Sequence, residues 1–140
     1  MKVTAKAFLS VLVAISAGFG AVATQAETAS PALVWNFDRE QPGTLPSELS
    51  IGTFFDGRPA GDWQVLTTDR AKSHPHVLAQ LMAKGAEHAY KVTLIKDVIA
   101  SDLTLEVSFL PIQGQADMGG GLIWRAADDR NYYLARANPL

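Results

Sequence analysis

Residues 102–109 read DLTLEVSF and alternate strictly between polar and apolar side chains. Residues 89–95 repeat this alternation over Tyr90, Val92 and Leu94. In an extended strand, a period of two places every apolar residue on one face and every polar residue on the other. A helix would scatter the same residues around its circumference. The two stretches therefore predict antiparallel strands with one solvated face.

Short strand candidates extend outward from these two stretches in both directions. Residues 38–50 contain Pro42, Gly43 and Pro46 and are predicted to form a loop. Residues 77–82 suit a strand or a short helix, and the preceding Pro75 favours the strand. The remaining candidate strands are residues 32–37, 62–67, 122–126 and 131–137. This pattern predicts an all-β fold, an antiparallel β-sandwich of jelly-roll type.

The last two candidate strands are joined by residues 127–130, which predict a hairpin. A four-residue connection sets Arg125 opposite Tyr132 and Trp124 opposite Tyr133. One face of the hairpin then carries a predicted core set of Leu122, Trp124, Tyr133, Ala135 and Ala137. The other face carries Ile123, Arg125, Tyr132, Leu134 and Arg136.

Three residues of the second face, Arg125, Tyr132 and Arg136, form the candidate ligand-binding site. Two guanidinium groups beside an aromatic ring suit sugar hydroxyls or a carboxylate. The alternative is an ordinary solvated sheet face, in which the arginine stems cover apolar surface. The indole rings of Trp35, Trp63 and Trp124 are expected to pack in the interior.

The N-terminus, residues 1–26, reads MKVTAKAFLSVLVAISAGFGAVATQA and predicts a helical, cleavable signal peptide. Two lysines precede an uncharged apolar run, and small residues offer cleavage after Ala23 or Ala26. An uncleaved membrane anchor is the alternative. Residues 27–31 form a short leader before the domain. The protein is thus expected in the periplasm or outside the cell, and because it has no cysteine it has neither disulfides nor a lipid-modified cysteine.

Charge and length limit the partners. Removal of the signal takes away two of the 12 basic residues and none of the 14 acidic ones, which leaves a net charge of −4. This acidity argues against nucleic acid, and against a membrane after signal cleavage. Residues 32–140 suit one domain. The chain stops directly after an aromatic strand, so we expect a C-terminally truncated domain that self-associates through its open edge strand.

A family resemblance appears in residues 119–125, GGGLIWR, and residues 129–138, DRNYYLARAN. With WNFD at residues 35–38 and GDW at residues 61–63, they resemble the concanavalin A-like lectin/glucanase jelly rolls. The closest variety is the 3-keto-disaccharide hydrolase type of domain of exported bacterial proteins. The resemblance implies a two-sheet jelly roll whose concave face often meets sugar. It also implies that this chain holds only the N-terminal part.

A glycosidase needs two carboxylates that flank the scissile bond. The glucanases of this fold carry a Glu-x-Asp-x-x-Glu pattern, which is not found in this sequence. The best remaining pair is Asp102 and Glu106, about 13 Å apart along one strand, which is long even for an inverting enzyme. No catalytic residue is assigned, and whether the protein is an enzyme stays open.

Metal-binding patterns are weak. Residues 74–76, His-Pro-His, with His88 as a third group, lack a neighbouring acid or cysteine that completes a known spacing. Asp117, Asp128 and Asp129 are candidate Ca²⁺ ligands, but turn chemistry explains them better. Hence no metal and no cofactor is expected.

Three functions follow from these patterns. The first is an exported carbohydrate- or glycan-binding jelly roll. The second is a glycoside hydrolase or lyase whose catalytic residues lie mostly beyond residue 140. The third is a structural sandwich module without a ligand.

Overall fold

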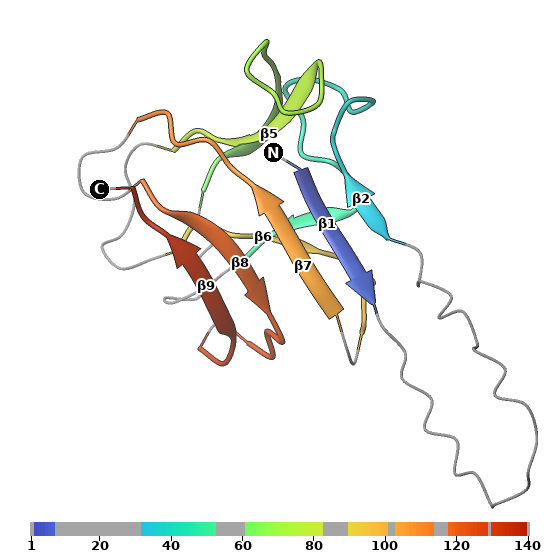
Figure 1. Ribbon diagram of the computed structural model, residues 1–140, viewed down its shortest axis with the longest axis vertical. Coiled ribbons are helices and arrows are strands. Elements are labelled where there is room, and N and C mark those ends of the chain that lie inside the picture. Colours follow the sequence, from blue (N-terminus) through green and yellow to red (C-terminus); the bar gives the residue numbers. More distant parts are fainter. Residues whose placement is uncertain are drawn as a thin grey trace, which may run out of the picture.

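The computed structural model describes residues 2–7, 32–52, 61–82, 90–100, 103–113, 118–128 and 130–139. Within these residues the chain forms nine strands and no helix (Figure 1). The strands are β1 (Lys2–Ala7), β2 (Leu33–Trp35), β3 (Leu49–Ile51), β4 (Trp63–Thr67), β5 (His76–Gln80), β6 (Thr93–Ile95), β7 (Leu103–Ser108), β8 (Gly120–Trp124) and β9 (Tyr133–Ala137). The predicted all-β class is confirmed for this part of the chain.

All strand pairs are antiparallel. One sheet has the order β2-β1-β7, and three further two-stranded sheets pair β3 with β6, β4 with β5, and β8 with β9. The β8–β9 hairpin lies beside β7, and β1 and β7 cross in front of β3, while β4 and β5 lie at one end (Figure 1). No helix in the described ranges is long and apolar enough to cross a bilayer.

The N-terminal segment differs from its prediction. Residues of the expected helical signal peptide form β1, which pairs with β2 on one side and with β7 on the other. The helical form is therefore wrong for Lys2–Ala7. Its sequence KVTAKA alternates with a period of two, and two flanking strands satisfy its backbone groups on both edges. Residues 8–31, with both predicted cleavage points and the leader, lie outside the described residues.

Most other strands agree with the sequence pattern, and β5 shows residues 77–80 of the ambiguous stretch 77–82 as a strand. There are two exceptions. β3 (Leu49–Ile51) includes the end of the predicted loop and pairs with β6. A three-residue strand is too short to show a period of two, so only its buried Leu49 marks it. β6 begins only at Thr93, so that Tyr90, Lys91 and Val92 of the strand predicted over residues 89–95 are not in a strand. β8 begins at Gly120, two residues before its predicted start, because the glycines at its beginning pair with β9.

The hydrophobic core lies among β2 to β6. Its buried residues are Phe37, Leu49, Val65 and Leu78, and Trp35, Leu45, Trp63 and Ile95 pack against them partly buried. The predicted packing of Trp35 and Trp63 is thus confirmed. The loop after β2 is fixed to β4 by two backbone hydrogen bonds, from the Gly43 N–H to the Val65 carbonyl and from the Val65 N–H to the Thr44 carbonyl, both 2.8 Å. The buried cluster draws no residue from β7, β8 or β9.

Candidate functional site

The β8–β9 hairpin has the register that the sequence predicts. Trp124 pairs with Tyr133, and the pairs Ile123–Leu134 and Leu122–Ala135 follow along the strands. Successive residues of a strand point to opposite faces, so Trp124 and Tyr133 share one face as expected.

The two aromatic rings stack at the end of the hairpin. Their centroids lie 5.8 Å apart and their planes are inclined by 18°. Tyr133 is 58% exposed and Trp124 is partly buried. The predicted place of Tyr133 in the core is therefore wrong. The reason is that the hairpin lies outside the buried cluster among β2 to β6, so that no core residue covers its ring.

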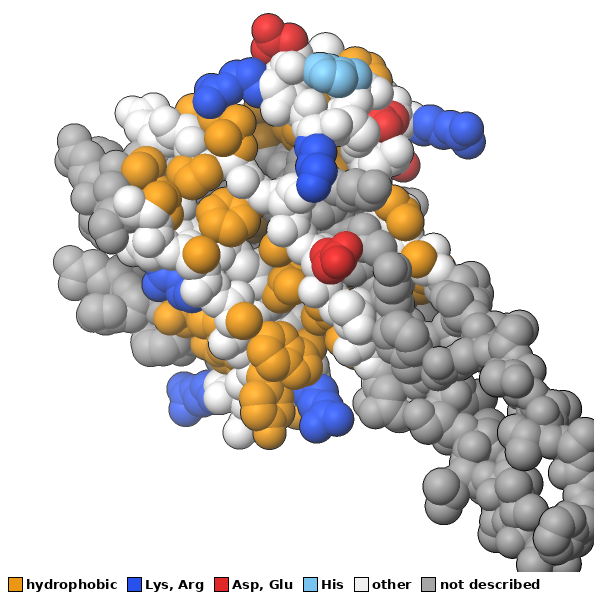
Figure 2. Space-filling view, viewed as in Figure 1, with side chains coloured by type: hydrophobic (Ala, Val, Ile, Leu, Met, Phe, Trp, Pro, Cys, Tyr) orange, Lys and Arg blue, Asp and Glu red, His pale blue; other side chains and the backbone are white. Residues whose placement is uncertain are grey.

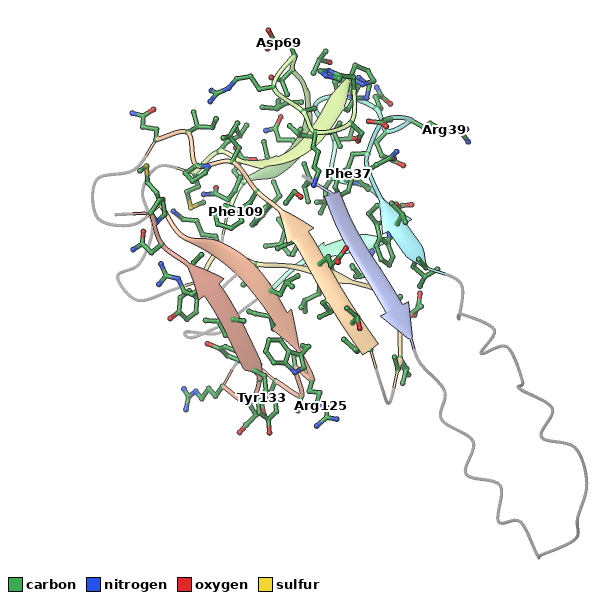
Figure 3. The ribbon with its side chains drawn as sticks, in the orientation of Figure 1. Phe37, Arg39, Asp69, Phe109, Arg125 and Tyr133 are labelled. Carbon is green, nitrogen blue, oxygen red and sulfur yellow. The ribbon has the colours of Figure 1, made fainter. Side chains whose placement is uncertain are left out.

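Hydrophobic side chains gather on the visible surface over β7, β8 and β9, with basic side chains beside them at the hairpin end (Figure 2). Figure 3 places Arg125 next to Tyr133 at this end. Arg125 is exposed and has a φ of 49°, a left-handed conformation that takes it out of the strand. Strand pairing ends at Trp124 and Tyr133, so the predicted pairing of Arg125 with Tyr132 is not formed.

Arg136 lies toward the other end of β9. It pairs with Gly121, and its guanidinium carbon is 5.8 Å from the centroid of the Tyr90 ring. It comes three positions after Tyr133, about 10 Å along an extended strand. The hairpin therefore divides the three predicted site residues, with Arg125 near the aromatic stack and Arg136 over Tyr90. The Tyr132 side chain is partly buried, and the residue has an interaction partner within the protein.

The turn that carries Arg125 is held by Asp128. Its Oδ1 accepts hydrogen bonds from the backbone N–H groups of Arg130 (2.8 Å) and Asn131 (2.7 Å). The Asn131 side-chain amide donates to both carboxylate oxygens, at 2.9 Å and 2.7 Å. The Ala127 N–H donates to the Asn131 carbonyl at 2.9 Å, which closes the turn. Hydrogen bonds from the Arg130 and Asn131 backbones and the Asn131 side chain lower the pKa of the Asp128 carboxyl.

This arrangement predicts that Asp128→Ala loosens the hairpin turn. The lowered pKa means that ionised Asp128 stabilises the turn above its ordinary pKa of 3.8, and that this contribution is lost as the pH falls through the folded pKa. We expect faster hydrogen exchange of the Asn131 amide in the variant than in the wild type. In the wild type, protection of this amide is expected to fall as the pH drops through the folded pKa of Asp128, whereas the variant, which lacks the carboxyl, is expected to show no such step. Asp69→Ala, in the exposed turn after β4, is the matched control. Equal exchange in wild-type and Asp128→Ala protein would contradict the role of the turn.

The other candidate groups remain apart. Among the described residues, no group of three His, Cys, Asp or Glu is placed to hold a metal. His74 is exposed and His76 partly buried, whereas His88, Asp117 and Asp129 lie outside the described residues. Glu106 is exposed on β7, and its predicted partner Asp102 is likewise outside the described part.

A small pocket of about 130 Å³ lies near the start of the domain. Its lining combines β2 and the loop after it, and it includes Arg39, Glu40 and Glu48. All its lining residues come from β2 and the loop between β2 and β3, and it shares no residue with the hairpin.

Comparison of the chain with protein-family models, with curated proteins and with solved structures finds no match.

Proposed function

We propose that this protein is an exported carbohydrate-binding domain of jelly-roll type, in which the Trp124–Tyr133 stack receives a sugar ring. The observation that carries the proposal is the exposed Tyr133 ring stacked on the partly buried Trp124 ring at the hairpin surface. A pyranose ring has an apolar face of C–H groups and a rim of hydroxyls. An exposed aromatic ring with a polar neighbour suits both parts.

Arg125 supplies the polar contact in this proposal. Its guanidinium offers five N–H donors in a planar fork, and its left-handed backbone places it beside the aromatic stack instead of within the strand (Figure 3). The Asp128 turn fixes the loop that carries it, which lowers the entropy lost when a ligand binds.

Export is the second part of the proposal. The two lysines, the uncharged apolar run and the small residues before Ala23 or Ala26 support removal of the first 23 or 26 residues and a periplasmic or extracellular location. The mass of the protein recovered from an exporting host tests this part directly. A product that still begins at Met1 would contradict it.

A titration with soluble disaccharides, for example cellobiose, laminaribiose and trehalose, tests the sugar site. Binding is expected to change the fluorescence of Trp124, and Tyr133→Ala is expected to weaken it at least about tenfold, or about 1.4 kcal/mol. Tyr133→Phe keeps the ring and is expected to bind nearly as well as the wild type.

Two further variants separate the contributions to sugar binding of Arg125 and of Tyr132, the tyrosine that the sequence analysis names as a site residue. Arg125→Ala is expected to weaken binding, whereas Tyr132→Ala is expected to change it little, because Tyr132 is partly buried away from the stack. Unchanged affinity in Trp124→Ala and Tyr133→Ala proteins that remain folded would contradict the stacking site. Unchanged binding by the Arg125→Ala, Tyr132→Ala double variant would count against a polar contact from either residue.

A further inference from the structure

The feature that points beyond sugar binding is the position of β1. Six of its residues pair with β7, from Lys2–Ser108 to Ala7–Leu103, and three pair with β2, from Val3–Trp35 to Ala5–Leu33. Because β1 is antiparallel to both neighbours, β2 and β7 are parallel to each other and one strand apart (Figure 1). We call the place that β1 occupies the β2/β7 slot.

The register between β1 and β7 matches residues of like character. The apolar positions Val3, Ala5 and Ala7 pair with Val107, Leu105 and Leu103 of β7. The alternate positions of β7 are polar, and Glu106 among them is exposed. Cross-strand partners of like polarity are the arrangement that stabilises a sheet.

Charge follows the same register. Thr4 pairs with Glu106, and the neighbouring pairs Lys2–Ser108 and Lys6–Thr104 place a lysine position on each side of this acid. By the alternation of a strand, both positions fall on the same side of the sheet as position 106, one on either side of the Thr4–Glu106 pair. The slot therefore favours a strand that has basic residues on both sides of the position opposite Glu106.

The next step rests on the proposed export. Both predicted cleavage points, after Ala23 and after Ala26, lie between β1 and β2, so signal removal separates β1 from the domain. The slot then exposes the backbone N–H and C=O groups of two edges. The two edges cannot pair directly unless β2 and β7 move about 4.8 Å closer, which is one strand spacing, and form the hydrogen bonds of a parallel strand pair. The slot therefore stays open to another strand.

We infer that processing converts the β2/β7 slot into a docking site for an extended peptide strand of a partner protein. The strand runs antiparallel to β7, carries small apolar residues at alternate positions, and has basic residues flanking the position opposite Glu106. Backbone hydrogen bonds supply the affinity, and the alternate side chains supply the specificity. Within the precursor, Lys2–Ala7 occupies the site.

The test uses the full chain with β1 removed from the slot by Val3→Pro and Ala5→Pro, since proline cannot donate to a ladder. The probe is a capped, labelled peptide of residues 2–7. We expect it to bind the double variant at least tenfold more tightly than the unsubstituted chain. Val11→Pro with Val13→Pro, outside β1, is the control and is expected to behave as the unsubstituted chain.

Charge reversal then tests the recognition itself. A peptide with glutamate at the two lysine positions is expected to bind the double variant several-fold more weakly than the native peptide. Adding Glu106→Lys to the double variant is expected to reverse the order of the two peptides. A merely structural effect of Glu106 would weaken both peptides alike.

Cross-linking keeps the test decisive if the double variant folds poorly. The chain has no cysteine, so Ala5→Cys with Leu105→Cys in the otherwise unsubstituted chain is expected to form an intramolecular disulfide across this register pair. Ala5→Cys with Leu94→Cys, on β6, is the control. Absence of the Ala5–Leu105 cross-link would overturn the inference, because β1 would then not occupy the slot.

Three other outcomes would also overturn it. They are equal peptide binding to the double variant and the unsubstituted chain, no order reversal by Glu106→Lys, and dimerisation at micromolar concentration of the double variant but not of the unsubstituted chain, which would make a second copy the occupant. These results are distinct from a failure of the proposed export, which the N-terminal mass alone decides, and from a failure of sugar binding, which the Tyr133→Ala titration decides.

Discussion

Leu78→Ala is expected to lower the free energy of unfolding by about 2–5 kcal/mol. Leu78 is only 5% exposed on β5 and belongs to the buried cluster with Phe37, Leu49 and Val65. The substitution removes buried methyl and methylene groups together with their packing contacts. It leaves a cavity that the surrounding strands fill only in part, because their backbones are held by pairing. Urea unfolding monitored by circular dichroism measures the loss as a lower transition midpoint.

Leu81→Ala is the matched control, because Leu81 follows the same strand but is 44% exposed. It is expected to cost less than about 1 kcal/mol. Equal losses in the two variants would contradict the location of the core among β2 to β6.

Gly121→Ala is expected to disrupt the β8–β9 hairpin and to destabilise it by about 1–3 kcal/mol or more. A Cβ at this position would collide with the Ala135 carbonyl oxygen and would lie 2.7 Å from the Arg136 Cα. Both are backbone atoms of the paired strand, so the two strands must move apart. The expected result is faster hydrogen exchange of the Leu134 and Arg136 amides and a weaker response of Trp124 to sugar.

Gly119→Ala provides the comparison two residues earlier. Its Cβ would meet the Arg136 guanidinium, including the carbon Cζ at 2.9 Å. A flexible side chain can swing aside, so this variant is expected to keep the hairpin and to displace Arg136 from Tyr90. A hairpin lost equally in both variants would contradict the backbone collision as the cause.

The long, regular strands were predictable from sequence because their patterning extends over several residues. β7 shows three apolar residues at alternate positions, and the hairpin register follows from the length of its connection. β3 has only three residues, which is too few for any period to appear. The sequence of the N-terminus predicts a helical signal because an apolar run follows Ala7. The strand form of β1 depends instead on pairing with β2 and with the distant β7, which the local sequence does not reveal.

The sequence predicts the strand register of the candidate site correctly, but it does not predict that the Tyr133 side chain is exposed. The register correctly placed Trp124 with Tyr133, but an aromatic residue in a strand was assigned to the core by its type. Which face of a hairpin is buried depends on how the sheets pack, and this is set by residues far along the chain. The left-handed turn at Arg125 was equally invisible, since arginine has no preference for that conformation.

The residues of the core cluster also lie close together along the chain, and this has a kinetic consequence. Phe37, Leu49, Val65 and Leu78 fall within one continuous stretch, and β4 and β5 pair as neighbours in sequence. Contacts of short sequence separation lose little chain entropy when they form, so they form early. Folding is therefore expected to nucleate around the β4–β5 pair, while the long-range pairing of β7 with a strand in the slot comes last.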